Sequence, residues 1–230
     1  MASTSPSSLG VALLGSGEMA TQLALLWAAA GVPLTVWARS EERLGWLLED
    51  VLEEHPDARL RAAPSAAAAT EAAGVLVPAL PWGAALGETL RGLLPLLPGR
   101  TVLDISNPYE MTPLGPKLAH YVPGGSAAAA VAELLPAGTG HVHAFTHVRS
   151  AALAAGAAAG APLPYVSNAV NDDDAVAALG ATGWVPLRVG GIAEASLVEA
   201  AGPWDRAAGR DGLGVPNARR AAELGLIPQP

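Results

Sequence analysis

The sequence predicts an α/β protein of the Rossmann-like, doubly wound class with a mostly parallel sheet. Short apolar runs alternate along the chain with segments of helical periodicity, an order typical of βαβ units. The first run, Val11 to Leu14, is followed by a glycine-rich turn and by a helical stretch that ends near Gly31. A second apolar run at 33–37 completes a strand–turn–helix–strand unit.

The same alternation is expected to continue through one domain at 9–200, with a disordered tail at 1–8 and a C-terminal segment at 201–230. Residues 109–123 are expected to form a looser region. We expect further helices at 41–54, 66–73, 82–97, 126–136, 175–179, 191–200 and 217–224, and further strands at 60–62, 75–80, 101–106, 141–148, 162–168 and 184–189.

Composition narrows the class of protein. At 230 residues with 51% hydrophobic residues, the chain can bury one good core. It has no cysteine, which excludes disulfides, thiolate catalysis and Cys-ligated zinc. The net charge of -8 argues against nucleic acid and anionic membranes as partners. The N-terminus lacks a signal-peptide pattern and Gly, Pro or charge interrupts the alanine-rich stretches, so we expect a cytoplasmic protein without a membrane span.

The glycine-rich turn, Gly15 to Ala20, has the pattern G-x-G-x-x-A between a strand and a helix. Gly15 would permit the tight turn, Gly17 would let a pyrophosphate approach the backbone, and the small Ala20 would let the helix lie close to the strand. The phosphates would meet the N-terminus of the helix near Glu18. A carboxylate there would repel them, so we expect Glu18 to point outward. The pattern predicts a dinucleotide site, with a plain βαβ glycine turn as the alternative.

The end of the second strand indicates which dinucleotide binds. An NAD site usually has an acidic residue there, whereas this chain has Arg39, Ser40 and Arg43. Two guanidinium groups and a hydroxyl are suited to the 2′-phosphate of NADP. The alternative is a helix N-cap at Ser40, with Glu41 and Glu42 in the first turn. Both interpretations can hold at once.

Four further segments follow in order, at 77–82, 104–108, 126–136 and 191–199. With the glycine turn and the end of the second strand, they resemble the NADPH-dependent reductases of the deazaflavin coenzyme F-420, and also the single reductase domain of the iron-reducing STEAP proteins. The resemblance covers residues 9–200.

The resemblance implies an NADP(H) site and a deazaflavin pocket over the nicotinamide, bordered by 144–148 and by the C-terminal part. To the NADP(H) site we add Glu18 and Asn107, although a strand-to-turn role for Asn107 is an equal alternative. The predicted cofactor-binding residues are Gly15, Ser16, Gly17, Glu18, Met19, Arg39, Ser40, Arg43, Ala79, Leu80, Pro81, Trp82 and Asn107.

The chain departs from the family where the second substrate should lie. The family usually has Ala-Phe-Asn-Thr or Ala-Leu-His-Thr after its sixth strand, and this chain has the sequence AFTH at 144–147. We therefore predict Thr146 and His147 as the catalytic candidates, with His147 (or His143) contacting the substrate or donating a proton, because imidazole titrates near neutral pH.

A strand at 141–148 would place His141, His143, Phe145 and His147 on one face. A metal site is one interpretation of this face. No carboxylate lies close in sequence to complete the ligands, so we predict no metal. A solvated or hydrogen-bonded strand end is the other alternative.

The predicted activity is that of an NADPH-dependent oxidoreductase with a deazaflavin (coenzyme F-420) as hydride partner. Hydride transfer between stacked rings depends mainly on orientation, so the lack of a catalytic triad is expected. The first alternative is a pathway-specific reductase of a small imine, carbonyl or unsaturated substrate. The second is a non-catalytic NADP-sensing protein. We also expect a homodimer, with the C-terminal tail covering the partner's cleft.

Overall fold

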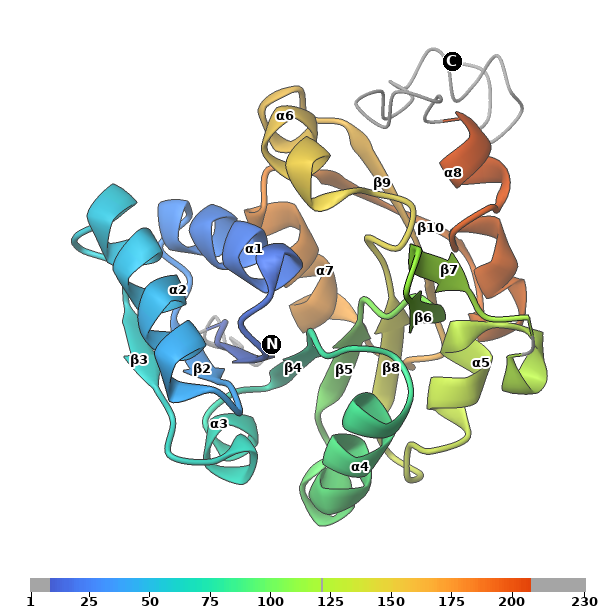
Figure 1. The fold of residues 1–230 in the computed structure, drawn as a ribbon, viewed down its shortest axis with the longest axis horizontal. Coiled ribbons are helices and arrows are strands. Elements are labelled where there is room, and N and C mark those ends of the chain that lie inside the picture. Colours follow the sequence, from blue (N-terminus) through green and yellow to red (C-terminus); the bar gives the residue numbers. More distant parts are fainter. Residues whose placement is uncertain (1–8, 121, 208–230) are drawn as a thin grey trace, which may run out of the picture.

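Eight strands form one sheet in the computed structural model, which describes residues 9–120 and 122–207 (Figure 1). Their order is β10-β9-β8-β5-β4-β1-β2-β3, and the strands from β8 to β3 are mutually parallel. β9 runs antiparallel to β8, and β10 is parallel to β9. The mostly parallel sheet predicted from the sequence is confirmed. The strands of this sheet are β1 (Val11–Leu14), β2 (Leu34–Trp37), β3 (Leu60–Ala62), β4 (Val75–Pro78), β5 (Thr101–Asp104), β8 (Gly140–His143), β9 (Pro162–Ser167) and β10 (Val185–Gly190).

Helices cover both faces of the sheet (Figure 1). α1 contacts α2, α6 and α7 on one face, while α3 and α4 lie together on the other, where α5 packs beside α4. The helices are α1 (Glu18–Ala29), α2 (Glu41–Glu54), α3 (Ala66–Glu71), α4 (Ala84–Leu93), α5 (Ala127–Ala132), α6 (Leu153–Ala158), α7 (Asp173–Ala181) and α8 (Pro203–Ala207), with 3-10 segments at Leu94–Leu96, Pro123–Gly125, Ser150–Ala152 and Ile192–Leu197 (η4). No helix in this part of the chain has the length and hydropathy required to cross a membrane.

The side-chain alternation of β1 shows why the sheet needs both layers. Val11 and Leu13 belong to the hydrophobic core under α1 and α2, whereas Ala12 and Leu14 belong to the core on the opposite face. All four are fully buried. A strand covered on both sides has no polar face, which is why it is a continuous apolar run in the sequence.

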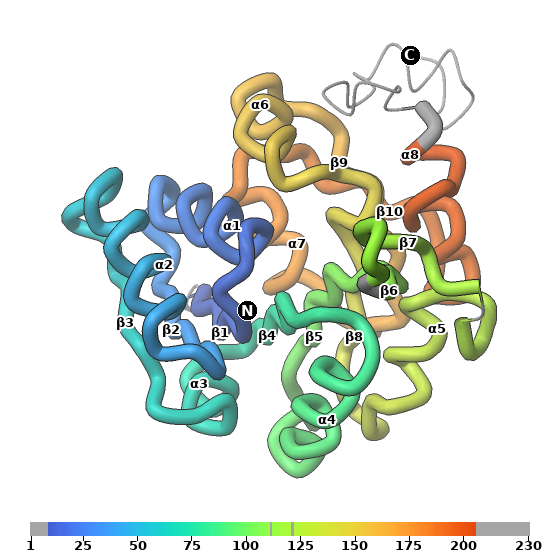
Figure 2. The backbone as a smooth tube through the Cα atoms, viewed as in Figure 1, coloured from blue at the N-terminus to red at the C-terminus, as the bar shows by residue number. Residues whose placement is uncertain are grey.

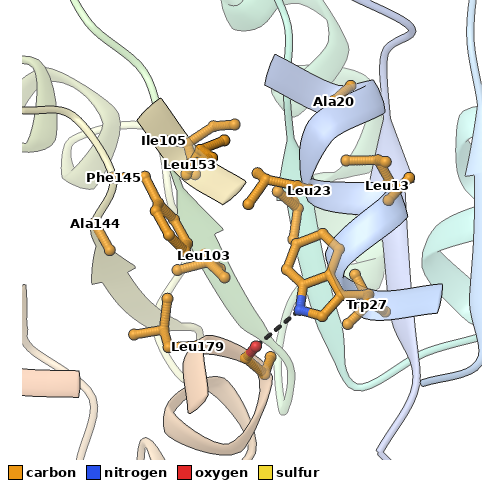
Figure 3. Packing of buried hydrophobic residues seen from close by; sticks show 14 of the residues in the cluster. Leu13, Ala20, Leu23, Trp27, Leu103, Ile105, Ala144, Phe145, Leu153 and Leu179 are labelled. Carbon is orange, nitrogen blue, oxygen red and sulfur yellow. Dashed lines mark hydrogen bonds between the residues drawn. The ribbon is translucent and has the colours of Figure 1, made fainter. Parts of the chain in front are cut away.

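The larger core joins the two ends of the sheet. Trp27 on α1 is fully buried, and its indole N–H donates a 2.7 Å hydrogen bond to the carbonyl of Ala178 on α7 (Figure 3). Leu23 of α1 lies in the same core as Leu153 and Phe145 (Figure 3). The half containing β1 and β2 is therefore packed directly against elements that accompany β9 and β10.

The structure corrects several predicted boundaries. The looser region predicted at 109–123 contains a hairpin of β6 (Tyr109–Thr112) and β7 (Gly115–Leu118), whose pairing is separate from the main sheet. The strand predicted at 141–148 ends at His143, and the helix predicted at 191–200 is only the 3-10 segment η4. The tail at 1–8 and the helix at 217–224 lie outside the described residues. The backbone trace in Figure 2 shows the β6–β7 hairpin close to the segment that leads to α8.

Candidate active site

A cleft of about 650 Å³ opens at the carboxyl ends of the central parallel strands. Its walls are the segments that follow β1, β4, β5 and β8. The chain turns in opposite directions along the sheet after β1 and after β4, so these neighbours form the switch point at which open α/β sheets bind their ligands. Among the predicted residues, the cleft brings together Gly17, Glu18, Met19, Ala79, Leu80, Pro81, Trp82, Asn107, Thr146 and His147.

The glycine turn at the start of α1 has the geometry that a pyrophosphate site requires. Gly15 has a φ of 127°, and a Cβ there would collide with the carbonyl oxygen of Ala79 at the end of β4. A Cβ on Gly17 would meet no described atom within 4 Å. Gly17 is the N-cap of α1, and no side chain of the described residues caps it. The first N–H groups of the helix therefore face a space wide enough for phosphate oxygens.

Glu18 is exposed, as expected, and it also lies among the residues that line the cleft, beside Met19. Its carboxylate lies at the positive end of α1, which stabilises it electrostatically.

The end of β2 carries the groups expected to select NADP. Ser40 is the N-cap of α2, and its hydroxyl accepts a 3.3 Å hydrogen bond from the backbone N–H of Arg43. The predicted helix cap is thus confirmed. The side chains of Arg39 and Arg43 are exposed next to it. These residues follow the strand adjacent to β1 and do not line the cleft itself. This is where the adenosine end of a dinucleotide would lie in the fold.

His147 lies in the segment after β8, in the wall formed by 146–151. The predicted strand breaks at Phe145, whose φ of 62° is rare for a bulky side chain, so His147 does not share a face with His141 and His143. The His147 ring is buried against Trp204, with ring centroids 6.1 Å apart. Neither ring nitrogen makes a hydrogen bond of good geometry to a described residue. Burial, partly offset by the carbonyl of Val198, lowers its pKa to about 4.

The low pKa of His147 corrects one part of the sequence argument. At neutral pH its imidazole is uncharged, so it can donate one hydrogen bond but is not a reservoir of an imidazolium proton. Thr146, the other catalytic candidate, has its hydroxyl committed to a 2.7 Å hydrogen bond with the carbonyl of Val198.

Asn107 connects the two walls of the cleft. Its amide nitrogen donates to the carbonyl of Thr146 at 2.8 Å, and its amide oxygen accepts from the N–H of Ala200 at 3.3 Å. Both interactions hold the chain in place, in agreement with the structural alternative for Asn107. The residue also lines the cleft, so contact with a ligand is compatible with this role.

Under the floor of the cleft lies a group of fully buried ionisable side chains. The Oδ2 atom of Asp104 on β5 is 2.8 Å from Nδ1 of His143 and 3.3 Å from Nε2 of His141, both on β8. Its Oδ1 atom accepts the N–H of Ser106. Burial acts to raise the pKa of Asp104, but the two imidazoles outweigh it and hold this pKa well below its usual range.

Glu199, which is only 7% exposed, approaches the same group from the segment that follows η4. Its Oε1 atom lies 3.3 Å from Nε2 of His143. Burial acts to lower the pKa of His143, yet the two carboxylates on either side raise it to about 9. His143 is therefore a buried cation at neutral pH. Sequence reasoning did not connect either carboxylate with the histidines, because Asp104 and Glu199 lie far from them along the chain.

The metal interpretation of the histidines had lacked a carboxylate ligand, and the structure supplies one. Ligand atoms of Asp104, His141 and His143 lie within 4.8 Å of one another, so the carboxylate that is missing in sequence is present in space. The contacts that the structure shows are nevertheless those of hydrogen bonds between a carboxylate and two imidazoles.

The cleft also contains polar residues that the sequence did not single out. Ser106 follows β5, and its buried hydroxyl has no hydrogen-bond partner among the described residues. Tyr109, Arg149 and Asp205 also line the cleft, and both charged groups act on the Tyr109 hydroxyl. Burial, together with the charge of Asp205, raises the pKa of Tyr109, and Arg149 partly opposes this. The position of Ser106 and Tyr109 after β5 and of Arg149 after β8 was the available signal, whereas Asp205 lies on α8 and had none.

Comparisons with known proteins agree with this architecture. The structure is similar to a proposed F-420-dependent NADP reductase from Arthrobacter (20% identity, 91% of this chain and 97% of that chain, TM-score 0.69). It is also similar to a hypothetical protein from Sinorhizobium meliloti (23% identity, 83% and 89%, TM-score 0.64). A reductive aminase from Aspergillus terreus, solved with NADPH and ethyl-5-oxohexanoate, matches at 22% identity over 80% of this chain but only 56% of its own (TM-score 0.60).

These structural similarities establish the fold. No curated protein sequence matches the chain significantly. Residues 10–108, from the start of β1 to the turn after β5, match the profile of the family described as NADP oxidoreductase, coenzyme F-420-dependent. This match covers less than half of the chain, and the part that it covers, which carries the glycine turn, is similar to the coenzyme F-420-dependent NADP oxidoreductases.

Proposed function

We propose that the protein is an NADPH-dependent oxidoreductase that transfers a hydride between NADPH and a deazaflavin of the coenzyme F-420 type. The observation that carries the proposal is a single cleft with the glycine turn on one wall and the neutral, buried His147 on the other. The family match and the similarity to a proposed F-420-dependent NADP reductase support the same reaction.

The residues of the glycine turn and of β2 fit NADPH. The uncapped N-terminus of α1 suits the pyrophosphate, and the open space at Gly17 allows its close approach. Arg39 and Arg43 offer charge-assisted hydrogen bonds to the 2′-phosphate. The turn at 79–82 borders the cleft where the nicotinamide ribose would lie. When bound, NADPH supplies the hydride.

The side chains that line the cleft would exclude water and orient the hydride acceptor. Trp82 and Ile105 lie among its lining residues and can exclude water from the reacting rings. The neutral imidazole of His147 can donate a hydrogen bond to a carbonyl or ring nitrogen of the acceptor without introducing a charge. Such a donor stabilises negative charge that develops on the acceptor. Orientation and one preformed donor are the contributions that this reaction needs.

A second candidate is direct reduction of a small imine, carbonyl or unsaturated substrate. It is favoured by one observation, that the His147 nitrogens and the Ser106 hydroxyl are buried at the cleft without partners among the described residues. The similarity to a reductive aminase is compatible with it. This reaction requires a proton donor near the accepting atom, and a neutral imidazole is a weak one.

Anaerobic absorbance measurements with NADPH and oxidised coenzyme F-420 test the proposal. Bleaching of the deazaflavin band that is much faster with NADPH than with NADH is the expected result. NADPH binding without bleaching would contradict the deazaflavin reaction. Turnover with an imine or ketone panel, abolished in His147→Phe while NADPH binding persists, would then establish the second candidate. Binding without any turnover would indicate a nucleotide-sensing protein.

A further inference from the structure

Glu199 is a buried carboxylate outside the lining of the cleft that joins three separate elements. Its Oε1 atom accepts a 3.0 Å hydrogen bond from the N–H of Ala128 in the first turn of α5. The same atom lies 3.3 Å from Nε2 of His143 on β8, which is within ion-pair distance although the two atoms do not have hydrogen-bond geometry. His143 in turn contacts Asp104 on β5. A chain of charges thus runs from the middle of the sheet to the segment that follows η4.

The residues on either side of Glu199 are bonded to the wall of the cleft. The carbonyl of Val198 accepts the hydroxyl of Thr146, and the N–H of Ala200 donates to Asn107. Three consecutive residues, 198–200, therefore contact four different partners: Thr146, Ala128, His143 and Asn107. Of the three side chains, only that of Glu199 is ionisable, and it is the one that reaches His143.

The position of these residues also decides where α8 begins. Ala201 has a φ of 65°, and a Cβ on Gly202 would collide with the carbonyl oxygen of Ser196, so the chain turns tightly here. α8 follows at once, and its Trp204 packs on the ring of His147. A displacement of residues 198–200 would consequently move both neighbours of His147: Thr146, which precedes it, and Trp204, which covers it.

We propose that Glu199 is a positioning residue that, through its ion pair with His143, holds residues 198–200 against the sheet and so orients the His147 ring toward the hydride acceptor. The inference depends on the proposed function in assuming that the reaction uses His147. A purely structural role would stabilise the fold without affecting the orientation of that ring.

The test compares Glu199→Gln with Glu194→Gln. The first change keeps an oxygen that can accept the N–H of Ala128 but removes the charge facing His143. The second alters an exposed carboxylate of η4 that accepts the N–H of Gly191 at 2.8 Å and does not contact His143. Circular dichroism of each variant shows whether it is folded, and NADPH titration shows whether the far wall of the cleft is intact.

We expect both variants to bind NADPH within about twofold of the parent. In Glu199→Gln, the imidazole ¹⁵N resonances of His147 should shift, and kcat with the acceptor should fall at least tenfold. Glu194→Gln should show neither effect. Glu199→Asp keeps the charge, so its His147 resonances and its kcat should lie between those of the parent and of Glu199→Gln. It replaces the glutamine variant in the comparison if that variant does not fold.

Unchanged His147 resonances in a folded Glu199→Gln protein would overturn the proposal, as would an aspartate variant no better than the glutamine variant. One equivalent of tightly bound metal, lost in His141→Gln, would also overturn it, because the cluster would then be a metal centre. The resonance measurement needs no acceptor. Failure of the deazaflavin reaction in the parent would therefore refute the proposed function while leaving the orienting role of Glu199 testable.

Discussion

Gly15 and Gly17 belong to one motif, but the structure separates what each contributes. Gly15 adopts a backbone conformation that L-residues rarely adopt, and it lies directly against the carbonyl of Ala79. The fold itself therefore requires glycine at this position. Gly17 has an ordinary φ of -83° and open space around it, so the fold does not require glycine there, whereas the proposed pyrophosphate would.

The two alanine variants should therefore behave differently. Gly15→Ala should lower the thermal midpoint by several degrees, because it adds backbone strain of about 1–3 kcal/mol and a steric collision. Gly17→Ala should keep the parent's thermal midpoint and weaken NADPH binding at least tenfold. Differential scanning fluorimetry and NADPH titration measure the two effects. Equal destabilisation by both changes would contradict the separation.

Arg39 is the residue whose replacement most directly tests the choice of dinucleotide. Arg39→Ala should weaken NADPH binding by roughly 1.5–3 kcal/mol while changing NADH affinity little, since only NADPH carries the 2′-phosphate. Isothermal titration with both cofactors provides the measurement. Replacement of the similarly exposed Arg59, whose guanidinium bonds to the carbonyl of Gly31, serves as the control. An equal loss for NADH would assign Arg39 a structural role.

At the scale of elements, the contact between α1 and α7 links the helix that follows the glycine turn to the far part of the sheet. Trp27→Phe removes the indole N–H and leaves the buried carbonyl of Ala178 without its donor. We expect the free energy of unfolding to fall by about 2–4 kcal/mol, measured by urea denaturation. Trp46→Phe, on the half-exposed face of α2, should change it by less than about 0.5 kcal/mol.

The elements also show what sequence reasoning could predict. Buried strands such as β1 and amphipathic helices such as α2 have local signals, and their boundaries are confirmed. The β6–β7 hairpin was missed because its two short strands depend on pairing with each other and contribute little to the core. The strand at 141–148 alternates as a strand should, but Phe145 turns out of it to pack at 88° against Trp184, a residue remote in sequence.

In the candidate site, too, the parts with a local sequence signal could be predicted and the parts assembled from distant segments could not. The glycine turn is a contiguous motif, so the side of the cleft that it forms could be predicted from the sequence. The wall around His147 is assembled from β5, β8 and residues 198–205, which are distant along the chain. Partners such as Asp104 and Glu199 become visible only when the topology places β5 beside β8 and brings the segment after η4 against them.

For the molecule as a whole, two buried histidines predict a stability maximum near neutral pH. His143 has a folded-state pKa of about 9, above its unfolded value of about 6.5, so its contribution is complete below pH 6.5 and is lost as the pH rises through 9. His147 has a folded-state pKa of about 4, so unfolding takes up a proton and stability falls by about 3 kcal/mol from pH 6.5 to 4.

Urea denaturation between pH 4.5 and 9.5 checks both sides of this curve. His143→Gln should flatten the alkaline side, and His147→Asn should flatten the acidic side. A parent protein whose stability does not change between pH 6.5 and 9 would show that His143 is neutral in the folded state.

The contact between Trp204 and His147 gives the molecule an optical property of its own. The indole is 1% exposed and lies over a ring that lines the cleft. Indole fluorescence is sensitive to the charge of a neighbouring imidazole, and its emission overlaps the absorption band of reduced nicotinamide. A chain that keeps Trp204 as its single tryptophan would therefore report, by the brightness of one residue, when the cleft is filled and when His147 gains a proton.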